Sequence, residues 1–126
     1  MVSIKCIFEK FSNIFFLRGR MSDTGNEETA RLRYIEAPII SNSVCQLTFG
    51  SIITPSNICL SGANRRSTCP GDSGGPLTIL HSGRQVQVGI VSFGSDSGCQ
   101  LGYPTAFARI TSFHDWIQTN TGIKIL

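Results

Sequence analysis

Seven residues, 71–77, restrict the fold of this chain more than any other part of its sequence: they read GDSGGPL. Three glycines surround Ser73, so the backbone can make turns that larger side chains would block, and its N–H groups can approach a ligand closely. A serine presented in this way suits nucleophilic attack, with neighbouring N–H groups stabilising an oxyanion. The alternative is a glycine-rich surface turn with an incidental serine. A sequence that matches only the pattern GxSxG more often has this second origin.

The residues around this segment exclude the nucleophile elbow of α/β-hydrolases. That elbow requires a strand before the serine and a helix after it. Here Cys69 and Pro70 come before the segment, and the apolar run Leu77–Leu80 follows a proline. Residues 61–76 are rich in Gly, Ser, Asn and Pro, which predicts a loop. We therefore expect the serine to lie in a loop of a β-rich domain.

Most of the remaining pattern is typical of strands. Residues 34–40 read as one strand, with Pro38 arguing for an edge or an irregular pairing. Residues 77–80 and 86–93 read as the two strands of a hairpin, and residues 106–110 as a further strand. These elements predict an all-β fold, a small β-barrel.

The two ends of the chain depart from this β pattern. Residues 113–117 follow helical spacing and Ser112 can cap them, which predicts a short C-terminal helix. Within residues 1–18, apolar side chains recur at three- and four-residue steps from Ile4 to Phe15, the period of an amphipathic helix. A membrane-surface or targeting helix is one interpretation of that period. We favour a start that packs loosely against the rest.

Composition indicates a globular protein of an oxidising compartment. The 126 residues are 40% apolar and 15% charged, enough to bury the core of one domain. The net charge of +3 is spread thinly, which argues against nucleic acid as a partner. No apolar run approaches the roughly 20 residues that cross a membrane. The five cysteines include no CxxC and no Cys/His pair at zinc spacing, so we expect disulfides and no metal site.

Several separated segments resemble the chymotrypsin-type serine proteases, the trypsin/chymotrypsin family. Residues 67–77, STCPGDSGGPL, are similar to that family's nucleophile motif. Residues 89–94, GIVSFG, resemble its substrate-binding strand, and the segments near the C-terminus resemble its last strand and terminal helix. The similarity runs from about residue 19 to residue 121. Its character is closest to the digestive chymotrypsin-like proteases of insects.

The resemblance implies an architecture as well as a family. Residues 19–126 are then the C-terminal half of a chymotrypsin-type double β-barrel: one six-stranded Greek-key barrel with a short C-terminal helix. Residues 1–18 are then an atypical segment, not native to the family. The resemblance also implies two disulfides, Cys45–Cys59 and Cys69–Cys99, and gives Cys6 no partner.

The resemblance assigns roles around the serine. Ser73 is the nucleophile, and the N–H groups of Gly71 and Ser73 form the oxyanion hole. The carboxylate of Asp72 binds the new amino terminus that activation cleavage makes. Removing one oxyanion-hole donor from such a site costs about 100–1,000-fold in rate.

A second group of residues is implied to bind substrate. Ser92, Phe93 and Gly94 pair with an extended substrate as an added strand. Ser67 lies at the base of the specificity pocket, with Thr105 and Gly94 on its walls. A preference for Lys or Arg needs a carboxylate at that base, so we expect an apolar residue before the cut. Thr105 stands where many relatives keep glycine, which makes the pocket shallower.

The family's catalytic histidine and aspartate precede the serine, on an N-terminal barrel. His81 and His114 both follow Ser73, so we expect neither to be the general base. We therefore expect a secreted serine endopeptidase of which this chain is the nucleophile-bearing half, inactive alone. The N-terminal barrel of the same protease would complete it; its substrates are proteins or peptides, and it needs no cofactor. The alternative is a non-catalytic homologue that binds peptides or a partner protein.

Overall fold

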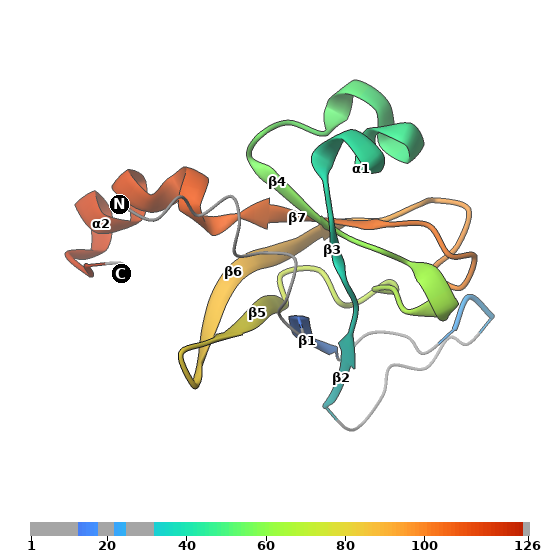
Figure 1. Cartoon of the computed structure of the whole chain (residues 1–126), viewed down its shortest axis with the longest axis horizontal. Helices are drawn as coiled ribbons and strands as arrows, with labels where there is room; N and C mark the ends of the chain where they lie inside the picture. The colour runs from blue at the N-terminus through green and yellow to red at the C-terminus, as the bar shows by residue number, and fades with distance from the viewer. Residues whose placement is uncertain (1–12, 18–21, 25–31, 125–126) are drawn as a thin grey trace.

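The computed structural model describes residues 13–17, 22–24 and 32–124 (Figure 1). Antiparallel strands dominate, and a helix lies near the C-terminus, as the sequence predicts. The strands are β1 (Asn13–Leu17), β2 (Arg33–Glu36), β3 (Ile39–Ile40), β4 (Asn57–Leu60), β5 (Pro76–His81), β6 (Arg84–Phe93) and β7 (Thr105–Arg109). The helices are α1 (Asn42–Phe49) and α2 (His114–Thr121), with 3-10 turns η2 (Gly50–Ile52), η3 (Ala63–Arg65) and η4 (Ile110–Phe113).

The sheet closes on itself into a barrel. Its strand order is β2-β1-β5-β6-β7-β4-β3, so β2 and β3 lie at opposite ends of the order. In the chain the same two strands are separated only by Ala37 and Pro38. They are therefore two halves of one bent strand, and counting them as one turns the 7 strands into the expected 6. The bend has a local cause: Pro38 has no N–H to donate to a ladder, and its carbonyl accepts instead from Ser61 N at 2.9 Å.

Three sequence-based expectations need correction or qualification. The strand predicted over 34–40 is interrupted at Pro38. Neither the helical period nor the loosely packed start expected for residues 1–18 holds over Asn13–Leu17, because these residues form strand β1, paired with β2 and β5; residues 1–12 and residue 18 lie outside the described residues. Ser112 does not cap α2, because the 3-10 turn η4 leads directly into it and Phe113 occupies the cap position.

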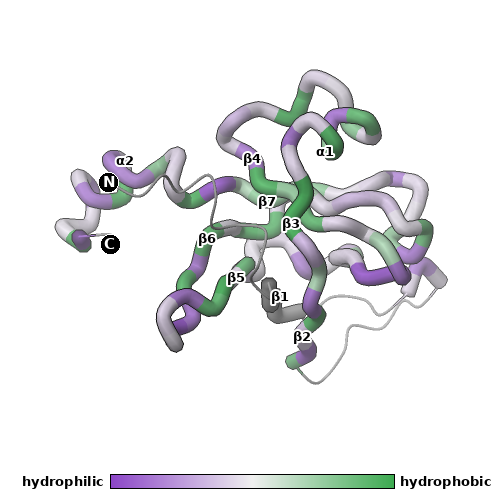
Figure 2. The backbone as a smooth tube through the Cα atoms, in the orientation of Figure 1, coloured by the Kyte–Doolittle hydropathy of each residue, from purple (hydrophilic) through white to green (hydrophobic). Residues whose placement is uncertain are grey.

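Two apolar clusters cover the two faces of strands β4 and β7. On one face Ile58, Leu60 and Phe107 are almost fully buried inside the barrel. On the other face Cys59 and Ala106, which sit opposite each other in the ladder, pack with Cys45 of α1. The alternation follows from the period of 2 in a strand. Each fully buried large apolar side chain contributes about 1.5–3 kcal/mol of burial free energy. Figure 2 shows β3 as a hydrophobic stretch, and this strand pairs with β4.

The hairpin between β5 and β6 matches the predicted one. Ser82 and Gly83 join its strands with φ of +50° and +74°, the sign that a two-residue turn of type I′ requires. Farther along β6, Gly89 is buried, and a β-carbon there would lie 3.2 Å from atoms of Leu77 and Phe107. Glycine at this position therefore lets β5, β6 and β7 pack closely.

Arg109 fastens the end of β7 to the neighbouring β4. Its Nη2 donates to the Asn57 carbonyl at 2.7 Å, and its Nε donates to the Pro55 carbonyl at 3.1 Å. Burial lowers the pKa of this guanidinium, which nevertheless stays protonated in a protein. Across the described ranges, no helix is both long and apolar enough to span a bilayer.

Candidate active site

Ser73 stands exposed on a loop that its glycines shape. Gly71 and Gly74 have φ of +97° and +83°, a region that residues with side chains adopt only with strain. The loop is anchored on β6, because Gly74 N donates to the Val91 carbonyl at 3.0 Å and Val91 N donates to Gly75 at 2.9 Å. The serine is thus presented to solvent by a tightly held backbone.

The backbone N–H groups beside Ser73 are available to a ligand. Asp72 N donates to the Cys69 carbonyl at 3.1 Å, which turns the chain at this point. Within the described part of the chain, the N–H groups of Gly71 and Ser73 have no protein acceptor. Two such donors near a serine hydroxyl suit the negatively charged oxygen of a tetrahedral intermediate.

The Asp72 side chain is turned inward, away from the exposed serine next to it. It is only 4% exposed, and its Oδ2 accepts from Cys69 N at 2.9 Å. This hydrogen bond braces the turn that carries the two available N–H groups. Its role toward an activated amino terminus stays a prediction.

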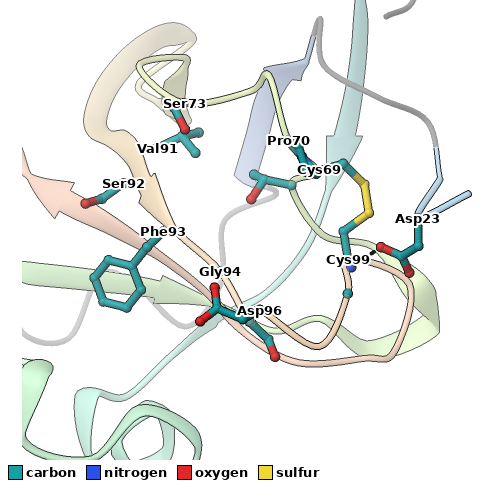
Figure 3. A pocket seen from close by; sticks show the side chains of 13 residues that line it. Asp23, Cys69, Pro70, Ser73, Val91, Ser92, Phe93, Gly94, Asp96 and Cys99 are labelled. Atoms are coloured by element: carbon teal, nitrogen blue, oxygen red, sulfur yellow. Dashed lines mark hydrogen bonds between the residues drawn. A yellow bond between two sulfur atoms is a disulfide. The ribbon is translucent and has the colours of Figure 1, made fainter. Parts of the chain in front are cut away.

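A cavity of about 340 Å³ opens beside the serine (Figure 3). Ser73 and Val91 lie at one side of it, and the Cys69–Cys99 disulfide lies at another. Its lining also includes the proposed substrate strand and two carboxylates: Ser92, Phe93, Gly94, Asp23 and Asp96. The structure therefore brings the serine and the three substrate-strand residues to one hollow.

Strand β6 extends past the end of its neighbour β5. The β5 partners of β6 end at the pair Pro76–Ile90, followed by the hydrogen bond from Val91 to Gly75. Beyond it, Ser92 and Phe93 continue the strand with β7 alone on the other side. The Phe93 ring packs edge-on against Phe49 of α1, with ring centroids 5.3 Å apart. This overhang leaves one short free edge directly beside the cavity.

Ser67 and Thr105 lie next to the cavity lining and bond to each other. Their hydroxyl oxygens are 2.8 Å apart, and Thr105 Oγ1 is also 3.2 Å from the hydroxyl of Thr68, which does line the cavity. Thr105 is 1% exposed, so its hydroxyl is satisfied inside the protein. The assignment of both residues to the specificity pocket stays a prediction.

Neither histidine contacts the serine. His81 ends strand β5 near the hairpin turn, and His114 begins helix α2. No hydrogen bond joins either ring to Ser73 in the described structure. Among the same residues, no group of three metal-ligating side chains occurs. Sequence reasoning overlooked two residues at this site, Asp23 and Asp96, because each is a single acid in a polar loop.

Comparison with known proteins decides the family. Residues 18–117 match the trypsin family. The chain belongs to that family. The matched range begins one residue before residue 19, where the sequence motifs place the start of the resemblance, and it includes the glycine-flanked Ser73.

Trypsin-family relatives of this chain occur in arthropods. It is 47% identical to brachyurin from Leptuca pugilator over 105 residues, which are 83% of this chain and 44% of that protein. It is 48% identical to a chymotrypsin from Phaedon cochleariae over 83 residues, 66% of this chain and 28% of that one. The solved structure of HL collagenase superimposes with a TM-score of 0.80 at 39% identity, covering 94% of this chain and 49% of that structure. The chain thus spans less than half the length of these relatives, and the expected chymotrypsin-type fold is confirmed.

Proposed function

We propose that this chain is the nucleophile-bearing barrel of a serine endopeptidase. One observation carries the proposal: an exposed Ser73 hydroxyl lies beside two N–H groups without protein acceptors, at the rim of a cavity that a free strand edge borders. A nucleophile, an oxyanion site and a place for an extended peptide are the parts that acyl transfer needs. Membership of the trypsin family supports the same activity.

The proposed reaction uses these groups in two steps. Ser73 Oγ attacks the scissile carbonyl carbon while a general base takes its proton, and the N–H groups of Gly71 and Ser73 stabilise the resulting oxyanion. The base returns the proton to the leaving amine as the peptide bond breaks, which leaves an acyl-serine. Water then attacks the acyl-serine and releases the carboxylic acid. A neutral serine without a base is a poor nucleophile, so we expect little activity from this barrel alone.

We assign the general base to a second, N-terminal barrel of the same protease. Support comes from apolar side chains on the surface: Trp116 is 67% exposed and Phe113 is 46% exposed. In Figure 1 helix α2, which carries Trp116, extends away from the barrel. Leu80 on β5 is also 46% exposed. A second barrel that covers these side chains would remove their apolar surface from water.

The proposed substrates are proteins cut after an apolar residue. Ser67 is uncharged and is bonded to Thr105, so this pair, the proposed base of the pocket, offers no carboxylate to a cationic side chain. The Asp23 and Asp96 carboxylates line the cavity beside the serine, and we place them outside that base. The bulk of Thr105 favours medium-sized side chains. We place the protease outside the cell, where the two disulfides of its described part are stable.

A fluorophosphonate probe tests the proposal, because it forms a covalent bond only with an activated serine. In the full-length native protein we expect labelling on the peptide that contains Ser73, and none in the Ser73→Ala variant. Ser95→Ala, which removes another hydroxyl at the same cavity, is the matched control and should keep the label. No labelling of the full-length protein would favour the alternative, a non-catalytic homologue that binds peptides. Paired Phe, Leu and Arg substrates then test the pocket, and a preference for Arg would overturn that part.

A further inference from the structure

Asp23 forms hydrogen bonds with residues 99 and 100, which are distant in the sequence and lie at one wall of the cavity. Its Oδ1 accepts a short hydrogen bond from Cys99 N at 2.6 Å, and its Oδ2 accepts from Gln100 N at 3.1 Å. The contact is reciprocal, because Asp23 N donates to the Gln100 side-chain oxygen at 3.3 Å. Figure 3 shows the carboxylate pointing at Cys99 from a segment distant in sequence. Hydrogen bonds to an ionised carboxylate are roughly twice as strong as those between neutral groups.

The residue before Cys99 is shaped to admit this carboxylate. Gly98 has φ of +135°, and a β-carbon at this position would lie 2.7 Å from Asp23 Oδ2. Any side chain there would therefore displace the carboxylate or the backbone. The close approach is the reason that the carboxylate can bond the next two N–H groups at once.

The segment that Asp23 bonds, residues 98–100, is joined to the loop of Ser73 by a covalent bond. Cys99 forms a disulfide with Cys69, which is two residues before Gly71 and its available N–H group. Asp23, Gly98 and both of these cysteines line the cavity. The position of this wall is thus set on one side by the disulfide and on the other by the carboxylate.

We propose that Asp23 is a positioning residue, which clasps residues 98–100 and thereby fixes the cavity wall against which substrate binds. Its consequence for catalysis rests on the proposed function, whereas its consequence for the wall does not. Asp23 has no hydrogen bond to Ser73 and acts only through the wall. Loss of the clasp lets the wall open locally while the barrel stays folded.

Disulfide-resolved reduction tests the clasp without any need for proteolysis. A mild thiol reductant is applied to the full-length protein, and each cysteine pair is quantified by alkylation and mass spectrometry. In Asp23→Ala we expect Cys69–Cys99 to be reduced about tenfold faster or more, with Cys45–Cys59 unchanged as an internal reference. Asp96→Ala is the matched control, because the Asp96 carboxylate lines the same cavity but forms no hydrogen bond with the described residues.

Asp23→Asn adds a graded variant. It keeps one carbonyl oxygen that can accept, so its reduction rate should lie between those of wild type and Asp23→Ala. Equal rates in wild type and Asp23→Ala overturn the proposal. So does an equal acceleration in Asp96→Ala, which would make the effect one of net charge.

A double variant separates the contact from backbone strain. Gly98→Ala both strains the backbone and displaces the carboxylate, so it should accelerate reduction of Cys69–Cys99 in the wild-type background. In Asp23→Ala no carboxylate remains to be displaced, so adding Gly98→Ala should accelerate reduction less. Strict additivity of the two effects would refute direct contact.

Kinetics of the active protease give the functional readout. With active sites counted by fluorophosphonate labelling, Asp23→Ala should raise KM several-fold more than it lowers kcat, and Asp23→Asn should recover part of the loss. A merely structural role would lower the count of active sites and leave KM unchanged. If no variant, wild type included, cleaves peptides, the proposed function fails while disulfide reduction still decides the clasp.

Discussion

Replacing Thr105 by valine removes one buried hydroxyl and keeps the shape of the side chain. That hydroxyl lies 2.8 Å from Ser67 Oγ and 3.2 Å from Thr68 Oγ1, and Thr68 N approaches it at 3.4 Å. Only the first contact has the length of a good hydroxyl hydrogen bond. Ser67 is partly exposed and can turn to water, whereas Thr68 is 7% exposed and cannot.

These contacts set the size of the effect. Stranding one buried polar group costs about 1–3 kcal/mol, and the long contacts place Thr105→Val near the middle, about 2 kcal/mol. At about 4 °C per kcal/mol for a domain of this size, Tm should fall by about 8 °C. In urea the midpoint should fall with the m-value unchanged. Thr48→Val on the exposed face of α1 is the control and should stay within about 0.5 kcal/mol. A Thr105→Val variant as stable as that control would show that the hydroxyl cluster contributes nothing.

Two further substitutions test the packing of the barrel and its cross-link, and both are measured by urea unfolding. Gly89→Ala should cost about 1–3 kcal/mol, because its new methyl group would lie 3.2 Å from buried side-chain atoms; Gly94→Ala meets no atom within 4 Å and should be near neutral. Replacing Cys45 and Cys59 together by alanine opens a loop of sequence separation 14, which should cost about 3 kcal/mol. An equal cost for the two glycine variants, or an intact free energy of unfolding without the cross-link, would contradict these accounts.

Elements with a local cause were predictable from the sequence. The hairpin of β5 and β6 depends on a two-residue turn with Gly83, and the loop of Ser73 depends on glycines at positive φ. Both leave their cause in adjacent residues. The break at Pro38 also has a local cause, the missing proline N–H, but the sequence indicates only an irregularity there, because Ser61, which bonds the bend from the end of neighbouring β4, is distant in the chain.

Elements whose cause lies elsewhere in the chain were missed. Helix α1 buries only Cys45, so it has no apolar stripe to reveal its period, although Ser41 caps it by accepting from Val44 N. Strand β4 is four residues long, too short for periodicity to separate it from a loop. The N-terminal period suggested a helix, but Asn13–Leu17 gain ladder partners on both sides as a strand.

The site follows the same division. Ser73 and its flanking glycines were identified because the chemistry and the backbone shape lie in one short segment. Asp23 could not be, since its partners are backbone N–H groups 76 and 77 residues away, which leave no side-chain pattern to recognise. The connection between Ser67 and Thr105 crosses 38 residues in the same way.

The closed barrel also bears on how this protein avoids aggregation. An open sheet exposes unpaired N–H and C=O groups along two edges, where further chains can add without limit. Here the bent strand of β2 and β3 occupies both ends of the sheet, so among the described residues no two separate strands are left as outer edges. The overhang of β6 at Ser92 and Phe93 is a short free edge beside the cavity. An edge this short is a poor template for a growing fibril, so on the proposed function one extended peptide can pair there without opening the sheet to the addition of chain after chain.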